Sequence, residues 1–186
     1  MQALDLLLNR VSVGRLLEPA PDAAQRELLF RAALRAPDHG QLRPWRFLTV
    51  EGEARVRLGE LFAAALAAGN PEVKPEALDK ARAMPLRAPL LVVVIARLSD
   101  HPKVPQQEQL LAAGSAAHGI LLAAHAQGLG AMWRTGELSY HPQVMAGLGL
   151  SASERIVGFL YLGSVEGERR VPQALEPADF VAAWQG

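Results

Sequence analysis

The chain has 186 residues, of which 50% are hydrophobic, 19 are basic, 19 are acidic and none is cysteine. This length and composition indicate a globular protein of one domain with a sizeable core, and the even charge excludes a net electrostatic attraction to nucleic acid or to an anionic membrane. The lack of cysteine excludes disulfides, thiol catalysis and cysteine-bound metal.

The N-terminal residues lack the pattern of a secretion signal. Residues 1 to 5 contain no basic residue, and the apolar run Leu6–Leu8 is too short for the apolar core of a signal peptide. No stretch approaches the ~20 apolar residues that a membrane helix needs. We therefore expect a soluble, cytoplasmic protein.

The first third of the chain alternates between helical and strand-like patterns. Residues 3 to 9 predict a short helix, and Asp22 is a candidate N-cap for a clearer second helix. Residues 46 to 50 alternate like a strand. Helical spacing returns over residues 53 to 68 and ends at Gly69-Asn70-Pro71.

Two strong apolar segments follow. Residues 90 to 96 form a continuous β-branched run, which predicts a strand buried on both faces. Residues 106 to 127 predict the longest helix, closed by Gly128, and from Gln109 onward it is apolar nearly all round. Such a helix is either covered by a second copy of the chain or is the core of a monomer, and composition alone does not choose.

The remaining segments complete the expected fold. Residues 156 to 162 predict a last strong strand, and residues 178 to 185 predict a short terminal helix. The loosest parts are expected at residues 71 to 89 and 99 to 105, which contain several prolines. Helices and few strands in mixed order favour an α+β or α/β sandwich.

The first candidate binding residues follow the first helix. Arg10 presents a planar fork that matches phosphate oxygens, and the hydroxyl of Ser12 adds a donor, with Arg15 close behind. The alternative is a structural role, in which the arginine complements the C-terminus of the helix and the serine acts as a cap.

A second basic segment lies between the second helix and the first strand. Arg35, His39, Arg43 and Arg46 surround the pair Pro44-Trp45. Basic donors beside a large aromatic residue suit a ligand with a phosphate and a flat ring, although an ordinary surface loop has the same composition. Proline stiffens such a turn, and glycine lets backbone pass close to another group, as a loop that holds a ligand requires.

A glycine-rich segment, residues 128 to 136, is expected to be a loop after the long helix. Its glycines and Trp133 suggest backbone amides close to something flat. It is not a dinucleotide fingerprint, because a helix precedes it, and residues 147 to 152 match that fingerprint only by chance. The five histidines show no zinc-binding spacing, and no serine lies in a nucleophile elbow. We therefore expect neither a metal site nor a hydrolase triad.

Taken together, these segments resemble the nitroreductase family, most closely its small YdjA-type NAD(P)H nitroreductases. The resemblance spans nearly the whole chain, with the motifs in family order. The matching segments are residues 6–12, 35–39, 44–47, 128–136 and 156–163.

The resemblance implies an α+β nitroreductase-like domain over residues 1–186, with a central mixed sheet flanked by helices. It also implies a homodimer with FMN at the subunit interface. Arg10, Val11 and Ser12 would meet the phosphate or pyrimidine side of FMN, and Arg35 and His39 would come from the other subunit. The remaining implied cofactor-binding residues are Ala131, Met132 and Trp133 beside the flavin ring, with Arg134, Thr135 and Gly136 toward its redox edge.

Two positions depart from the family pattern. Many members have two consecutive arginines where this chain has Arg10-Val11, so part of the anion recognition is either lost or moved. The residues that could take it over are Arg15, Arg43, Arg169 and Arg170. Arg43 also stands where glutamine is common before Pro-Trp, which would change the charge of the pocket.

The function implied by the resemblance is an FMN-dependent NAD(P)H oxidoreductase. It would pass hydride from NADH or NADPH through FMN to a nitroaromatic, a quinone or a similar electron-poor acceptor. No side chain is expected to act as a catalytic acid or base, because the flavin carries the chemistry. Two alternatives stay open: an FMN-dependent dehydrogenase or reductase of an unidentified metabolite, and a non-catalytic dimeric FMN-binding protein.

Overall fold

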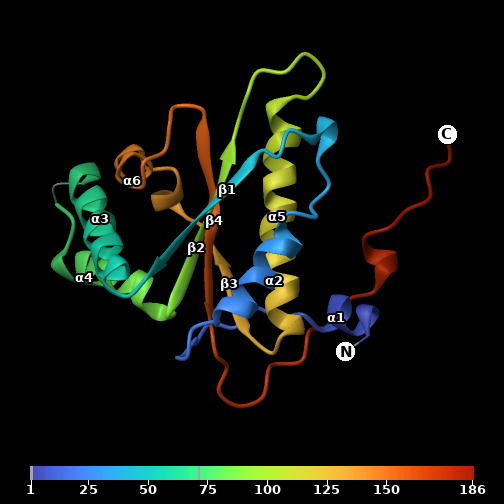
Figure 1. The fold of residues 1–186 in the computed structure, drawn as a ribbon, viewed down its shortest axis with the longest axis horizontal. Helices are drawn as coiled ribbons and strands as arrows, with labels where there is room; N and C mark the ends of the chain where they lie inside the picture. The colour runs from blue at the N-terminus through green and yellow to red at the C-terminus, as the bar shows by residue number, and fades with distance from the viewer. Residues whose placement is uncertain (1, 71) are drawn as a thin grey trace.

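A four-stranded sheet between two helical layers forms the centre of the protein (Figure 1). The computed structural model describes residues 2 to 70 and 72 to 186. The strands are β1 (Trp45–Glu51), β2 (Leu90–Arg97), β3 (Gly130–Arg134) and β4 (Glu154–Gly163). The helices are α2 (Ala23–Ala33) and α5 (Gln106–Ala126) on one face, α3 (Glu53–Gly69), α4 (Pro75–Ala83) and α6 (Pro142–Gly147) on the other, and α1 (Ala3–Asn9) at the start of the chain.

The sheet confirms an α+β fold but corrects one expectation about it. The strand order is β1-β2-β4-β3, and every pairing between these strands is antiparallel, so the sheet is not mixed. The connection from β1 to β2 shows the physical reason. Glu51 pairs with Leu90, so the chain leaves β1, forms α3 and α4 on one face, and re-enters the sheet at the end where it left.

Strand β2 is buried on both faces, as its sequence predicts. Leu90, Val92 and Val94 face the α2–α5 layer, and the residues between them face the α3–α4 layer. All of them are fully buried. Because burial of a valine or leucine side chain stabilises the fold by about 1.5–3 kcal/mol, this strand is the main apolar element shared by both layers.

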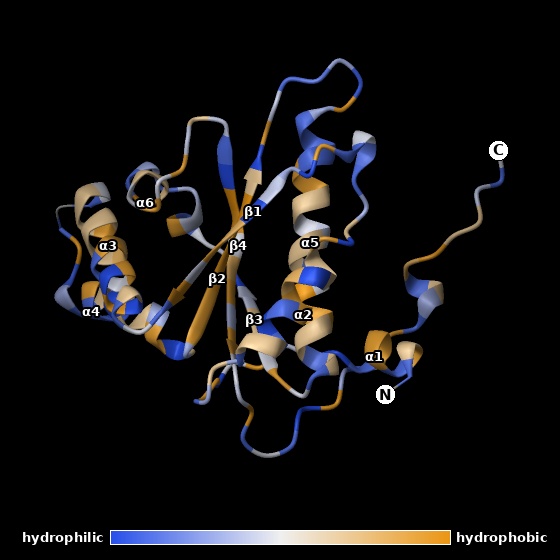
Figure 2. Cartoon of the chain, in the orientation of Figure 1, coloured by the Kyte–Doolittle hydropathy of each residue, from blue (hydrophilic) through white to orange (hydrophobic). Residues whose placement is uncertain are grey.

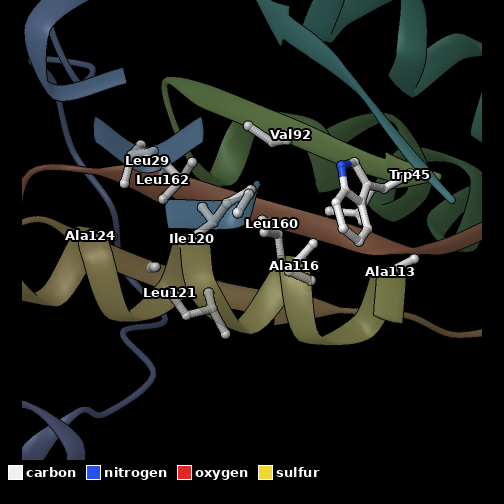
Figure 3. Close-up of a cluster of buried hydrophobic side chains, with 14 of the residues drawn as sticks. Leu29, Trp45, Val92, Ala113, Ala116, Ile120, Leu121, Ala124, Leu160 and Leu162 are labelled. Carbon is white, nitrogen blue, oxygen red and sulfur yellow. The ribbon is translucent and has the colours of Figure 1, made fainter. Parts of the chain in front are cut away.

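Small residues let α5 pack closely on the sheet. Ala113, Ala116 and Ile120 are fully buried against β4 and its neighbours, as Figure 3 shows. Only one face of α5 is covered in this way. The side chains of Leu110 and Leu111 on the opposite face are 41% and 62% exposed.

Local signals placed the early elements correctly. The Oδ1 atom of Asp22 accepts a hydrogen bond from the backbone N–H of Gln25 at 2.8 Å, which makes it the expected N-cap of α2. The helix predicted at residues 53 to 68 extends to Gly69. Pro71, which was expected to help end it, lies outside the described residues.

Three predictions about the weaker segments were wrong. Residues 178 to 185 form no helix, and only the 3₁₀ turn η4 (Pro177–Asp179) interrupts an exposed tail. Residues 72 to 89 of the segment expected to be loose are ordered, because they contain α4 and the 3₁₀ helix η2 (Met84–Arg87). The expected loop at 128–136 contains strand β3. The prolines in residues 72 to 89 obscured the helical pattern there, and the glycines in residues 128 to 136 obscured the pattern of the short strand.

An ion pair joins β1 to the start of β4 across β2. The Nη2 atom of Arg46 lies 2.9 Å from Oε2 of Glu154, whose side chain is only 9% exposed. The hydrogen bond from Arg46 lowers the pKa of Glu154 to about 2, against a smaller opposing effect of burial. Arg46 therefore holds the sheet together and is not free to bind a ligand.

No helix within the described residues is long and apolar enough to cross a membrane.

Replacing Glu154 by glutamine should remove this ion pair and lower the free energy of unfolding at pH 7. The pKa difference between 4.5 and about 2 corresponds to an upper limit of about 3 kcal/mol. Because the folded-state pKa is depressed, the contribution is present above pH 4.5 and is lost as the pH falls toward 2. Urea unfolding at several pH values measures both effects, with Glu176→Gln on the exposed tail as the control. Equal stability of the wild type and Glu154→Gln at pH 7 would contradict the assignment.

Candidate functional site

The segment after α1 runs beside the edge strand β3. The backbone N–H of Val13 donates a hydrogen bond to the carbonyl of Ala131 at 3.0 Å. This contact brings the predicted residues Arg10, Val11 and Ser12 next to the predicted group at Ala131. The structure therefore joins two sequence motifs that lie more than a hundred positions apart.

A cluster of basic side chains lies at the C-terminal end of α5. Arg169 donates hydrogen bonds to the carbonyl of Leu129 at 3.0 Å and to Nδ1 of His125 at 3.4 Å. Burial lowers the pKa of His125, and the positive charges of Arg169 and Arg10 lower it further. Since arginine can only donate, Nδ1 must accept, and the imidazole is the neutral member of the cluster.

This basic cluster is suited to an anion. In residues 2–70 and 72–186, neither Arg10 nor Arg169 forms an ion pair with a carboxylate. Arg15 instead approaches Glu166 at 3.9 Å, where both side chains are exposed. Four arginines were candidates to replace the second arginine that many family members have at the position of Val11. Of these, Arg169 is the one that lies near Arg10, since both charges act on His125. No signal in the sequence distinguished it from the other three.

Trp133 lies across strand β4. Its Nε1 donates to the carbonyl of Val157 at 3.3 Å, and the indole occupies the space where any side chain at Gly158 would begin. Strand alternation then separates the predicted residues of β3 into two groups. Ala131 and Trp133 face the α5 layer, whereas Met132 and Arg134 face the α3 layer. A ligand on the Trp133 side could meet only the backbone of the latter pair.

A depression on this face follows the outer side of α5 and has a volume of about 620 Å³. Arg35 and Trp133 both border it, at the end of α2 and on β3 respectively. Its floor is the exposed face of α5, with Leu111 and His118. Arg35 and Trp133, which the family resemblance assigns to cofactor binding, therefore border the same broad open surface.

His39 lies far from the basic cluster. Its Nδ1 atom is 2.6 Å from Oε2 of Glu108, in the first turn of α5. His125, in the last turn, is 17 positions further on, and 17 residues of α-helix span about 25 Å. The predicted residues are thus divided between the two ends of α5, and one copy of the chain does not bring Arg10 and His39 together.

The loop before β1 has an unusual backbone. Gly40, Gln41 and Arg43 have φ angles of 73°, 54° and 49°, which is the left-handed region. The Oδ2 atom of Asp38 accepts the N–H of Arg43 at 2.6 Å and holds this conformation. Trp45 anchors the end of the loop, since its side chain is buried in the α5 layer. Trp45 therefore supports the loop from its buried end.

The turn after β3 is exposed and begins with the predicted residues Thr135 and Gly136. Gly136 has a φ of 117°, which explains why glycine is needed there. The chain then enters the 3₁₀ helix η3 (Glu137–Ser139). Within the described part of the chain, no group of three His, Cys, Asp or Glu side chains is placed to hold a metal ion.

Comparison with known proteins shows to which family the chain belongs. The family model described as "Nitroreductase family" matches residues 7–164. The chain belongs to the nitroreductase family. It is 46% identical over 165 residues to "Putative NAD(P)H nitroreductase YdjA" of Escherichia coli K12, with 88% of each chain covered. It is 37% identical over 183 residues to "Putative NAD(P)H nitroreductase" of Haemophilus influenzae, covering 97% of this chain and 98% of the relative.

Solved structures of the nitroreductase fold agree with this assignment. A nitroreductase-like family protein from Bacillus cereus superposes with a TM-score of 0.85 at 22% identity, covering 100% of this chain and 97% of the other. A nitroreductase with bound FMN from Bacteroides fragilis has a TM-score of 0.72 at 20% identity, covering 97% of each chain. At these identities the structures support the fold alone.

Replacing Gly158 by alanine should displace Trp133, because the added methyl group would collide with the indole. We expect a shifted tryptophan emission and a loss of about 1–3 kcal/mol in unfolding free energy. Emission spectra of the variant in the wild-type and Trp133→Phe backgrounds isolate the signal of Trp133. Gly14→Ala is the control, since a Cβ there meets nothing within 4 Å. An unchanged Trp133 signal would show that the indole does not cover Gly158.

Proposed function

We propose that this chain is an FMN-dependent NAD(P)H oxidoreductase that acts as a homodimer on nitroaromatics, quinones or similar electron-poor acceptors, with residues 1–186 forming one nitroreductase-like domain. The observation that carries the proposal is the pair Arg10 and Arg169 beside the edge of β3, neither of which has a carboxylate partner among the residues that the structure describes. The relatives named as NAD(P)H nitroreductases and the neighbour with bound FMN support the choice of cofactors.

The basic cluster fits the phosphate of FMN. Two guanidinium groups would supply charge-assisted, forked hydrogen bonds to its oxygens, and the hydroxyl of Ser12 would add a further donor. Neutral His125 would support Arg169 through the 3.4 Å hydrogen bond rather than bind the anion itself. Val11 is 7% exposed, so its side chain contributes packing, and its backbone remains the part that could face the cofactor.

The edge of β3 fits the flavin ring. Ala131 directs its carbonyl away from β4, toward Val13. Because backbone groups alternate along an antiparallel strand, the N–H and C=O of Trp133 point in the same direction. These groups, with the amides at Thr135 and Gly136, could hydrogen-bond the polar edge of a flat ring. Trp133 and the backbone of Met132 and Arg134 would then form one wall of the site.

The side chains of this site bind and orient rather than exchange protons with a substrate. When bound, FMN supplies the chemistry of hydride acceptance from NADH or NADPH and of delivery to the electron-poor acceptor. The protein holds the phosphate at one end, fixes the ring against β3, and leaves the depression beside Trp133 open for the flat donor and acceptor molecules. Accordingly, we assign no catalytic acid or base.

The exposed apolar surface supports a homodimer. Leu110 and Leu111 lie on the outer face of α5, and α1 carries further exposed leucines, which Figure 2 shows in orange. The tail leads away from the body with large hydrophobic side chains that are 64% to 92% exposed, namely Val171, Leu175, Phe180, Val181 and Trp184. Apolar area of this extent on one side of a molecule is typical of an interface.

A two-fold dimer through α5 would also complete the site. If the two copies of α5 pack in opposite directions, the first turn of one helix lies beside the last turn of the other. Arg35 and His39 of one copy would then approach Arg10 and Arg169 of the partner. This arrangement would bring Arg10 and His39 to one site, as the family resemblance implies, although the two ends of α5 are about 25 Å apart within one chain.

The purified protein, incubated with FMN and freed of excess, should show flavin absorption that is lost on anaerobic addition of NADH or NADPH. NAD+ and NADP+ serve as controls, because they carry no hydride to donate. Retained absorption with both reduced nucleotides would exclude the oxidoreductase and leave a flavin-binding protein. A preparation that binds no FMN would reject the proposed cofactor.

Mixed dimers test the division of the site between copies. Arg10→Ala and Arg35→Ala should each weaken FMN binding about tenfold or more, since each removes a charge-assisted contact. In a dimer with one chain of each kind, one of the two sites keeps both arginines, so one FMN per two chains should be retained with wild-type affinity. Exposed Arg57→Ala is the matched control. Mixed dimers that retain no tightly bound FMN would show that both arginines serve a site within one chain.

A further inference from the structure

A second cavity lies at the end of β3, and residues 132 to 135, which the proposed flavin site also uses, are among those that line it. It has a volume of about 310 Å³ and lies between the sheet and the α3–α4 layer. Its apolar walls come from Phe62 on α3, Met84 on η2, Met132 on β3 and Phe159 on β4. This volume is at the lower end of the range for small-molecule sites, about 300–1,000 Å³.

Two arginines meet in this cavity. The guanidinium of Arg134 lies over the ring of Tyr161 at 5.4 Å from its centroid, and Arg87 borders the same space. Burial raises the pKa of Tyr161 and outweighs the opposing effect of the charges of Arg134 and Arg87. The tyrosine therefore stays protonated and is a third hydrogen-bond donor.

Neither arginine is satisfied by the protein. Within residues 2–70 and 72–186, no carboxylate forms an ion pair with Arg87 or Arg134, and the buried Nε of Arg134 has no hydrogen-bond partner. Two like charges around one phenol repel each other, and a buried donor without a partner is costly. A structural role would leave both costs in place, whereas a bound anion would remove them.

We propose that this cavity binds a small aromatic carboxylate. Its carboxylate would lie between Arg87 and Arg134 and accept a hydrogen bond from the hydroxyl of Tyr161, and its ring would pack against Phe62, Phe159 and the two methionines. Arginine matches the two oxygens of a carboxylate by its forked geometry. The apolar walls favour this ligand over a fully hydrated inorganic anion, because a polar ion would leave them uncovered.

The probe is benzoate, titrated into the FMN-treated protein by calorimetry and followed in parallel by flavin absorption. We expect benzoate to bind at one site per chain without release of FMN, and benzamide, which has the same ring but no charge, to bind at least about tenfold more weakly. Arg87→Gln and Arg134→Gln should each weaken benzoate binding by about tenfold, and Arg57→Gln on the exposed face of α3 should not change it.

Thermal unfolding separates a binding role from a structural one. Arg134→Met keeps the length of the side chain but removes the buried charge, so the midpoint without benzoate should be unchanged or raised. Benzoate should raise the midpoint of the wild type but not that of Arg134→Met. The proposal is overturned if benzoate does not bind the wild type, if it binds the two glutamine variants equally well, or if it binds only by displacing FMN. A lowered midpoint of Arg134→Met with unchanged benzoate affinity would also overturn it.

Discussion

The close packing of α5 on the sheet sets the distance between the two groups of basic side chains that contain His39 and Arg169. Alanines at 113 and 116 let the helix lie directly on β4 and β2, which fixes a rigid rod of 21 residues across one face. His39 is held at its first turn through Glu108, and Arg169 is held at its last turn through His125. The distance between these groups is therefore a property of the helix and does not depend on loop conformation.

Strand β3 gives the two sides of the sheet different chemistry. Successive side chains of a strand point to opposite faces, so Trp133 faces the broad surface along α5 while Arg134 faces the smaller cavity under α3. The position of β3 at the sheet edge leaves some of its backbone groups directed outward. One strand of five residues thus contributes to both the proposed flavin site and the proposed carboxylate site.

Elements with strong local signals could be predicted from the sequence. The apolar run of β2, the cap at Asp22 and the length of α5 were sufficient to place them. Strand β3 was missed because it is short and lies in a segment with three glycines, residues 128 to 136, and α4 because prolines surround it. The family resemblance placed Arg10 and Trp133 in one region. It could not show that Arg46 pairs with Glu154, 108 positions away, or that Arg169 donates a hydrogen bond to His125. Such pairings depend on how the chain folds.

The contact between Trp133 and Gly158 has a consequence for how this sequence can diverge. The indole fills the volume that a side chain at position 158 would need, so neither position can change size independently. A smaller residue at 133 would uncover the backbone of β4, and a larger one at 158 would expel the aromatic ring. The two positions should therefore drift as a pair over evolutionary time, with glycine opposite an aromatic residue or a bulkier residue opposite a compact one.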